Sequence, residues 1–316
     1  MTVMKDLSDY IKGYSYIPII TGPTASGKSS LALDLCRKSG GELISCDSMQ
    51  IYKTLDIGTA KDSSDELQEI VHHMTDIIEP GADYSVKDYT DEALKVMTSV
   101  LEQGKLPVVC GGTGQYVSAL YYGLDYGDCE IAEEIVEKIN SELEEKGADA
   151  LYEKLQAIDP EAASKIHPNN TRRLIRALAV YEATGKTFSQ KNMESKKSGP
   201  VYPFKVFFLD VDRDMLYDRI NRRVDIMFDQ GLIEEVEKLY SSGASRTSTC
   251  FQAIGYKEFA DYFDGKCSLD DVRDKIKLNS RHYAKRQITW FRAMPDVVRV
   301  PFGTGAEEII KEILSR

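Results

Sequence analysis

The segment GPTASGKS, residues 22–29, constrains the fold of this chain more than any other feature. It matches the pattern GxxxxGK[ST] and lies between a short apolar run, Ile17 to Thr21, and helical sequence from Lys28 to Lys38. The pattern is specific in this context, because it needs a strand before it and a helix after it. Its glycines let backbone N–H groups turn inward around phosphate oxygens, and the helix N-terminus adds positive partial charge. The sequence therefore predicts a phosphate-binding loop (P-loop) here.

The side chains of this loop have distinct predicted roles. Lys28 supplies a point charge for phosphate oxygens, and the Ser29 hydroxyl is placed to bind Mg²⁺. The residues that we assign to diphosphate or nucleotide binding are Gly22, Pro23, Thr24, Ala25, Ser26, Gly27, Lys28 and Ser29. The loop alone leaves open which phosphorylated compound binds there.

The rest of the chain supplies the other parts of an α/β fold. Short apolar runs predict strands at 17–21, 42–46, 106–110, 204–211 and 296–300. Helical periodicity predicts helices at 28–38, 87–103, 214 to about 240, and 269–291. Strand, helix and strand at these lengths imply parallel strands with right-handed crossovers. The predicted fold class is therefore α/β, with a P-loop-type core in which helices flank a parallel β-sheet.

A helical segment interrupts this core. From about Tyr121 the sequence has helical periodicity without a strand-like run, and the Asn-, Ser- and Lys-rich stretch 189–200 is typical of a return linker. We therefore divide the chain into a catalytic core, 1–120 and 200–316, and an all-helical insertion domain, 121–199.

Two basic segments stand out from an acidic chain. The 316 residues carry a formal net charge of -11, with 40 Lys+Arg and 51 Asp+Glu, which argues against a partner held by general attraction to phosphate. Residues 164–197 nevertheless contain eight bases and two acids, and residues 275–292 contain six bases and no acid. Such segments permit a specific polyanion site, although a solvated helix face is an equally good explanation.

Targeting signals and metal-binding patterns are missing from the sequence. No apolar run approaches the ~18 residues of a membrane span, and the N-terminus lacks the zones of a signal peptide, so we expect a cytoplasmic protein. The six cysteines are scattered without a CxxC pattern, which favours neither a disulfide framework nor a zinc site. His72 and His73 are adjacent, which is poor geometry for one metal ion, and we assign them to a loop.

The sequence also lacks the acidic metal ligand of an ordinary nucleotide hydrolase. Such an enzyme needs an acid after an apolar strand, whereas the strand at 106–110 leads into Gly111-Gly112-Thr113. Asp210 and Asp212 follow another strand, but acids at strand ends commonly serve turns, and we interpret these two in that way.

Asp47 is a candidate catalytic carboxylate. It follows the strand at 42–46, at the carboxyl end that lies beside the P-loop in a parallel sheet. An acid there can accept a proton from a nucleophile or orient an amino group, although Asp followed by Ser is also good N-cap chemistry for a helix. Thr113, after the strand at 106–110, faces the same crevice by the same argument.

Seven blocks of sequence together resemble bacterial tRNA dimethylallyltransferases. They are GPTASGKS (22–29), LISCDSMQIYKTLDIGTAK (43–61), HHMTDI (72–77), PVVCGGTGQY (107–116), IHPNNTRRLIRALAVY (166–181), AIGYKE (253–258) and AKRQITWFR (284–292). The blocks occur in the same order as in that family and span nearly the whole chain. Several of them are specific to the family rather than to P-loops in general.

The resemblance implies a reaction. A dimethylallyl group is transferred from dimethylallyl diphosphate to N6 of the adenosine 3′-adjacent to the anticodon, in tRNAs that read codons starting with U, and diphosphate is released. The P-loop would hold the diphosphate with Mg²⁺ as cofactor. The acid that matches Asp47 would act as general base, and Thr113 and Arg223 match positions that bind the diphosphate.

The resemblance also implies which residues meet the tRNA anticodon stem-loop. They are Asp47, Ser48, Met49, Gln50, Thr113, Arg172, Arg173, Leu174, Ile175, Arg176, Gln252, Ala253, Ile254, Gly255, Tyr256 and Lys257. The arginines lie in the first basic segment, so the insertion domain contacts tRNA in this interpretation. We expect a monomer without a membrane partner.

Three alternatives share parts of the pattern. An isopentenyltransferase acting on free AMP, ADP or ATP has the same loop and acid, a small-molecule or nucleoside kinase would bind ATP at the loop, and an RNA-binding module would carry a vestigial loop. The arginine cluster at 172–176 argues against the first alternative and the missing metal-ligand strand against the second. The intact loop with Asp47 argues against the third.

Overall fold

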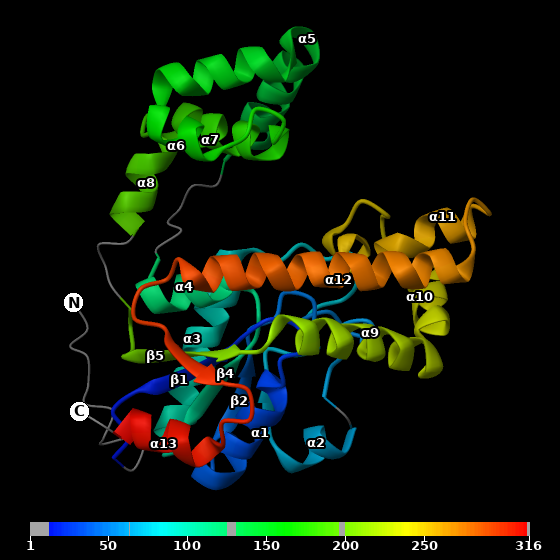
Figure 1. Cartoon of the computed structure of the whole chain (residues 1–316). Helices are drawn as coiled ribbons and strands as arrows, with labels where there is room; N and C mark the ends of the chain where they lie inside the picture. Colours follow the sequence, from blue (N-terminus) through cyan, green and yellow to red (C-terminus); the bar gives the residue numbers. More distant parts are fainter. Residues whose placement is uncertain (1–12, 63, 125–130, 196–199, 315–316) are drawn as a thin grey trace. The chain divides into compact units, whose positions relative to one another are not determined.

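The computed structural model describes residues 13–62, 64–124, 131–195 and 200–314. By its internal contacts the chain divides into two compact units (Figure 1). Unit 1 comprises Met1–Ser118 and Val201–Arg316, and unit 2 comprises Ala119–Pro200.

Unit 1 is built on a six-stranded parallel sheet with the strand order β3-β2-β4-β1-β5-β6. The strands are β1 (Ile17–Thr21), β2 (Glu42–Ser45), β3 (His72–His73), β4 (Pro107–Cys110), β5 (Phe204–Asp210) and β6 (Val298–Pro301). Every residue of β1, β2 and β4 is buried. This explains the largely apolar sequences of β1 and β4, whereas β2 also buries Glu42 and Ser45. The predicted α/β fold class is confirmed.

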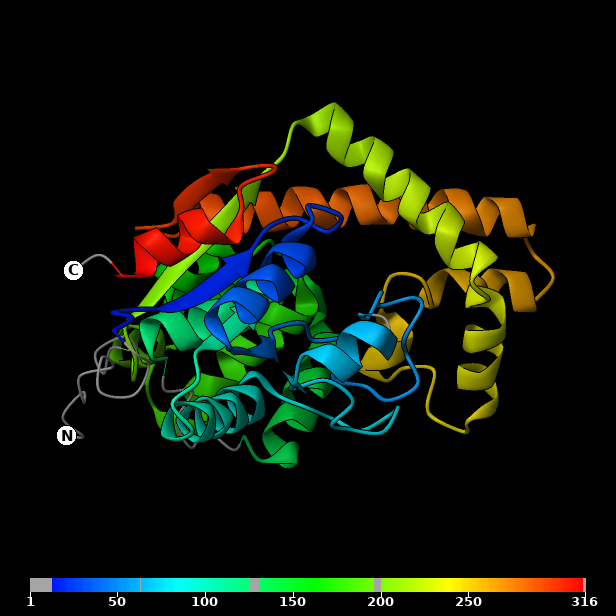
Figure 2. The same ribbon diagram turned by 90° about the horizontal axis from the view of Figure 1, so that it is seen from below.

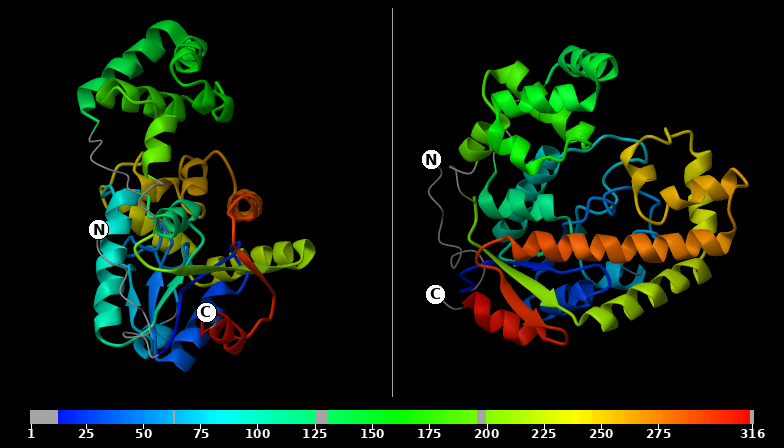
Figure 3. Two further views of the ribbon diagram at one scale, coloured as in Figure 1. Left: turned by 90° about the vertical axis from the view of Figure 1, so that its left-hand side faces the viewer. Right: turned by 45° about the horizontal axis from the view of Figure 1, so that its top comes forward.

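Helices cover both faces of this sheet. Figure 3 shows α3 (Val86–Glu102) on one face and α1 (Lys28–Ser39) with α13 (Ala306–Leu314) on the other. Figure 2 shows α1 and α13 side by side, and they pack against each other. Two further helices of the first half are α2 (Ser64–Glu69) and α4 (Gly114–Tyr122).

A second group of helices follows β5. The long helices α9 (Arg213–Asp229) and α12 (Leu269–Arg292) run side by side (Figures 1 and 3). Between them in sequence come α10 (Leu232–Ser241), η2 (Thr249–Gln252), η3 (Lys257–Phe259) and α11 (Ala260–Phe263). Their buried side chains share one core with Ile51, Tyr52 and Leu55. This core brings the segment after β2 close to η2 and η3.

Unit 2 consists of helices within its described residues. They are α5 (Glu133–Ile158), α6 (Pro160–Lys165), α7 (Thr171–Thr184) and α8 (Phe188–Ser195). Side chains from α5, α6 and α7 form a separate core around Ile139, Leu155 and Leu174. Gly147 has φ 80° and ψ 170°, so α5 is two helices joined at a kink.

Three local predictions differ from the structure. His72 and His73 form the edge strand β3 rather than a loop, because Leu43 and Ile44 of β2 pair with them. The helical sequence from 214 to about 240 is divided at Gly231, whose φ of 98° is strained for other residues. The predicted linker at 189–200 is helical up to Ser195, and residues 196–199 lie outside the described residues.

Within the described residues, no helix combines the length and the apolar character that a membrane crossing requires.

Candidate active site

The P-loop has the strand–loop–helix context that its sequence predicts. β1 ends at Thr21 and α1 begins at Lys28, directly after the loop. Gly27 is the N-cap of α1 with φ 92°, a left-handed conformation that favours glycine. Three loop side chains, Thr24, Lys28 and Ser29, line a cavity.

Side chains from α9 and α12 hold the backbone of this loop. Gln287 of α12 accepts the Thr24 N–H through Oε1 at 2.8 Å, and its Nε2 donates to the Gly112 carbonyl at 3.0 Å. Arg219 of α9 donates from Nε to the Ala25 carbonyl at 2.7 Å. The loop is therefore fixed by two elements that are distant in sequence, and no local sequence pattern indicates these contacts.

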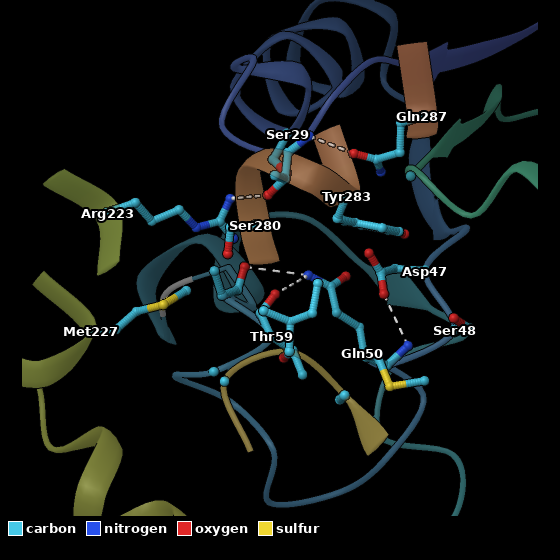
Figure 4. A pocket seen from close by; sticks show the side chains of 18 of the residues that line it. Ser29, Asp47, Ser48, Gln50, Thr59, Arg223, Met227, Ser280, Tyr283 and Gln287 are labelled. Atoms are coloured by element: carbon cyan, nitrogen blue, oxygen red, sulfur yellow. Dashed lines mark hydrogen bonds between the residues drawn. The ribbon is translucent and has the colours of Figure 1, made fainter. Parts of the chain in front are cut away.

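The cavity has a volume of about 340 Å³ and draws most of its lining from six parts of unit 1. These are the P-loop, the segment after β2, residues 58–62, α9, residues 249–257, and α12. In Figure 4, Arg223 and Met227 reach in from α9, Tyr283 and Gln287 come from α12, and Asp47 comes from the segment after β2.

Two half-buried cations lie at the P-loop side of the cavity. Burial lowers the pKa of the Lys28 ammonium, and the positive charge of Arg223 lowers it further. Burial likewise lowers the pKa of Arg223, while Asp47 and Asp62 partly offset both shifts. The Arg223 Nη1 lies 3.4 Å from the Thr24 hydroxyl. Because two desolvated cations are costly without a counter-charge, this side of the cavity favours an anion.

Asp47 lies two residues beyond β2 and lines the same cavity. Its Oδ1 accepts the Met49 N–H at 2.9 Å, which forms a turn. The segment that follows is irregular, so the alternative that Asp47 is a helix N-cap is wrong. The structure thus places the carboxylate and the two cations around one cavity.

Thr113 supports the segment that carries Asp47. Its Oγ1 accepts the Ser48 N–H at 2.9 Å and lies 3.3 Å from the Ser48 hydroxyl. The Thr113 hydroxyl is therefore engaged with the protein, and a role in diphosphate binding stays a prediction.

Of the two acids that the sequence assigned to turns, Asp212 caps a helix and Asp210 forms an ion pair. Asp212 caps α9 by accepting the N–H groups of Asp214 and Met215. Asp210, at the end of β5, pairs with Arg299 at 3.3 Å.

Helix α12 contributes four polar side chains to the cavity, of which sequence motifs indicated none individually. They are Ser280, Tyr283, Arg286 and Gln287. Burial raises the pKa of the Tyr283 hydroxyl, and the negative charge of Asp47 raises it further, so the phenol is neutral near pH 7. The Arg286 guanidinium lies 5.5 Å from the centre of the Tyr283 ring.

The predicted tRNA-binding residues separate into two groups. In unit 1, those that line the cavity are Asp47, Ser48, Met49, Gln50, Gln252, Ala253, Ile254, Gly255 and Lys257, whereas Tyr256 is fully buried beneath them. In unit 2, Arg172, Arg173 and Arg176 are exposed on α7. Leu174 is fully buried and Ile175 packs against the same core, so within residues 172–176 only the three arginine side chains are exposed.

The residues around the P-loop fit a magnesium ion that arrives with diphosphate. The described residues contain no group of three or more His, Cys, Asp or Glu side chains that could hold a metal ion. The Ser29 hydroxyl, however, lines the cavity beside Lys28. Mg²⁺ keeps several waters and takes substrate phosphate oxygens as ligands, so one protein hydroxyl is sufficient. His72 and His73 pair instead with Asp62 and Glu42.

The fold and this cavity define a P-loop α/β enzyme that joins an anion cradle to a carboxylate in the same cavity. The family model described as IPP transferase matches residues 50–294, and one described as Isopentenyl transferase matches residues 15–83. The chain belongs to the IPP transferase family.

Similar proteins cover most of the chain. A tRNA dimethylallyltransferase of Caldanaerobacter subterraneus is 48% identical over 279 residues, which are 88% of this chain and 89% of that protein. One from Bacillus cereus is 44% identical over 301 residues, 94% of each chain.

Similar solved structures have names of the same kind as these relatives. A full-length tRNA isopentenylpyrophosphate transferase from Bacillus halodurans has a TM-score of 0.68 at 42% identity, covering 95% of this chain and 94% of that one. A eukaryotic dimethylallyltransferase acting on tRNA has a TM-score of 0.77 at 30% identity, covering 90% of this chain and 73% of that one. The chain is therefore a prenyl-transferring enzyme, which excludes the kinase and the non-catalytic module.

Proposed function

We propose that this chain transfers a dimethylallyl group from dimethylallyl diphosphate to N6 of the adenosine 3′-adjacent to the anticodon, in tRNAs that read codons starting with U. The observation that carries the proposal is a single cavity that joins Lys28 and Arg223 to Asp47. Two cations suit a diphosphate, and a carboxylate suits the amino group of an adenine.

The chemistry follows from these positions. The bond from N6 to the allylic C1 forms while the bond from C1 to the diphosphate oxygen breaks, and Asp47 accepts the proton that N6 loses. Lys28 and Arg223 stabilise the negative charge that grows on the departing diphosphate. When bound, Mg²⁺ would add Lewis-acid stabilisation of that charge, with Ser29 as the residue that holds it.

The cavity also has a place for the hydrocarbon. Ile220, Val224 and Met227 line it from one face of α9, at spacings of four and three residues, and Ile276 lines it from α12. These apolar side chains lie on the same helix as Arg223, which supports a donor with a charged head and an apolar tail.

The acceptor in this proposal is a tRNA anticodon stem-loop. Support comes from the cavity-lining residues Gln50 and Gln252, which offer amide groups for a base edge, and from the exposed arginines of α7. Base flipping would bring the adenine amino group to Asp47. We expect the enzyme to act as a monomer in the cytoplasm.

The reaction is tested with purified protein, Mg²⁺, labelled dimethylallyl diphosphate, and either an anticodon stem-loop or free AMP as acceptor. We expect label in the stem-loop and none in AMP. Label in AMP alone would identify an enzyme of the free-nucleotide type.

Asp47→Asn tests the base. Removing the proton acceptor should lower kcat by about 100-fold or more, while the Kd for the stem-loop stays within a few-fold, because the amide keeps the side chain's shape. Asp210→Asn, which changes an exposed acid at the end of β5, is the matched control and should leave kcat unchanged. Weaker stem-loop binding with normal kcat would refute the assignment.

A further inference from the structure

Glu235 on α10 has an unusually complete set of hydrogen bonds for an acidic side chain. It is 9% exposed and accepts four bonds. Its Oε2 accepts the N–H groups of Asp56 and Ile57, both at 2.8 Å, and its Oε1 accepts the Gly58 N–H at 2.9 Å and the Tyr256 hydroxyl at 2.6 Å. All four partners are donors, which is the arrangement that suits an ionised carboxylate.

The first segment that Glu235 holds is residues 56–60. Three successive backbone N–H groups of this segment converge on one carboxylate, as they do around bound anions. The segment continues into Gly58, Thr59 and Ala60, which line the cavity. The Gln50 Nε2 then donates to the carbonyls of Thr59 and Ala60 at 3.4 and 3.3 Å (Figure 4). Glu235 is thus connected to Gln50 through this segment.

The second segment is residues 252–257, which Glu235 reaches through Tyr256. The two segments fit closely, since a Cβ on Gly58 would lie 2.6 Å from the Tyr256 ring. Burial raises the pKa of the Tyr256 hydroxyl, and the charge of Glu235 raises it further, so this phenol stays a donor. Around Tyr256, residues Gln252 to Gly255 and Lys257 line the cavity.

A second buried acid, Glu258 of η3, joins the same segment to α12. Glu258 is 1% exposed, accepts the Gly255 N–H at 2.9 Å and accepts from the Asn279 Nδ2 at 2.6 Å. Residues 252–257 are therefore fixed to α12 by Glu258 and to residues 56–60 by Glu235. Of these two contacts, only the one from Glu235 joins both cavity-lining segments to each other.

We propose that Glu235 is a positioning residue for the RNA acceptor: it fixes residues 56–60 and 252–257 as one wall of the cavity, against which the stem-loop docks. The inference rests on the proposed function, which places RNA against Gln50 and residues 252–257. The donor cradle is held by other contacts, from Gln287 and Arg219. Loss of the Glu235 contacts should therefore affect the acceptor and spare the donor.

Glu235→Gln is the principal test. If the amide turned its NH₂ toward the Asp56 and Ile57 N–H groups, two of the four bonds would be replaced by donor–donor contacts. If the NH₂ faced the Gly58 N–H and the Tyr256 hydroxyl, the hydroxyl could rotate to accept, and one donor–donor contact with Gly58 would remain. We expect the KM and Kd for the stem-loop to rise about tenfold, with kcat and the KM for dimethylallyl diphosphate within twofold of wild type. Amide hydrogen exchange at residues 56–58 should become faster.

Two further variants complete the test. Tyr256→Phe removes one of the four bonds and keeps the ring, so we expect a smaller rise in the stem-loop KM, and this variant decides the question if Glu235→Gln does not fold. Glu237→Gln, an exposed acid on the same helix, makes the same charge change and should match wild type.

The outcomes separate the possible roles. A folded Glu235→Gln with an unchanged stem-loop KM, or with equal increases in both KM values, would overturn the proposal. A lower melting temperature with both KM values unchanged would also overturn it, because that result describes a purely structural residue. Failure of the wild-type enzyme to label any stem-loop would instead refute the proposed function.

Discussion

At the scale of single residues, the cavity is defined by charges that compensate one another only in part. Lys28 and Arg223 are desolvated next to each other, and Asp47 and Asp62 offset part of their mutual repulsion. A diphosphate would complete this compensation. The protonation of these residues should therefore change when the donor binds.

Donor affinity should depend on pH through Lys28. Its pKa is lowered in the free enzyme, and a bound diphosphate would favour the ammonium form, so binding takes up a proton once the pH exceeds the lowered pKa. We expect the Kd for dimethylallyl diphosphate to increase as the pH rises through that value, which lies below the ordinary 10.5 of lysine.

Calorimetric titrations between pH 7 and pH 10 would measure this dependence. Lys28→Arg is the control, since a guanidinium stays charged over this pH range. The Kd of this variant should show only the pH dependence that both proteins share. Identical slopes for the two proteins would assign the pH dependence to another group.

The predictability of these residues follows from how local their contacts are. The P-loop and Asp47 could be identified because the strand, the turn and the helix that place them are contiguous in sequence. Gln287 and Glu235 could not, because their partners lie 263 and 179 residues away. A glutamine or a glutamate on an amphipathic helix is ordinarily a surface residue, and only tertiary packing made these two buried acceptors.

At the scale of elements, α12 is the helix that links the P-loop to the rest of the site. Gln287 joins the loop to the end of β4, and Trp290 donates from its indole Nε1 to Ser118 at 3.1 Å. Asn279, nearer the start of the helix, binds Glu258. One helix thus contacts the P-loop, α4 and the segment 252–257.

Gln287→Met should loosen the P-loop. The methionine has a similar volume but leaves the Thr24 N–H and the Gly112 carbonyl without their partner, which should lower the free energy of unfolding by about 2–4 kcal/mol. The KM for dimethylallyl diphosphate should rise more than the KM for the stem-loop.

Urea denaturation and steady-state kinetics would check both expectations. Thr289→Val, which replaces an exposed hydroxyl that donates to the Lys285 carbonyl in the same helix, is the control for a change on α12. A Gln287→Met protein with wild-type stability and donor KM would show that the two hydrogen bonds contribute nothing.

Sequence patterns predicted some helices and strands but missed some of their boundaries. The long buried strands β1 and β5 were predictable from apolar runs, whereas β3 has two residues, too few for any periodicity. The helical sequence from 214 to 240 gave one continuous pattern because the apolar spacing resumes after Gly231. The left-handed conformation of that glycine is what separates α9 from α10.

At the scale of the whole molecule, the residues predicted to bind RNA are divided between two compact units. The cavity belongs to unit 1, and the exposed Arg172, Arg173 and Arg176 belong to unit 2. The helical character of unit 2 could be predicted from its periodicity, and its arginines from the basic segment. The burial of Leu174 between them follows from the helical repeat and limits the contact to one face of α7.

Replacing the three arginines together with alanine should weaken stem-loop binding and spare the donor. Each lost phosphate contact should reduce the slope of log K against log salt by about 0.7–0.9. The Kd for dimethylallyl diphosphate should not change, because its predicted ligands lie in unit 1.

Anisotropy titrations of a labelled stem-loop at several salt concentrations would measure the slope. Lys165→Ala removes a cation of the same basic segment that is already paired with Glu161, and it should have little effect. An unchanged slope in the triple variant would remove α7 from the RNA interface.

The 24 residues of α12 extend about 36 Å, at 1.5 Å per residue. The P-loop and the proposed acceptor wall are both held by this one helix, so the helix sets the distance between them. A change in the shape of the helix would therefore displace the P-loop and this wall together. A bend in α12, such as a proline on its solvent side would cause, should therefore misalign both substrates at once.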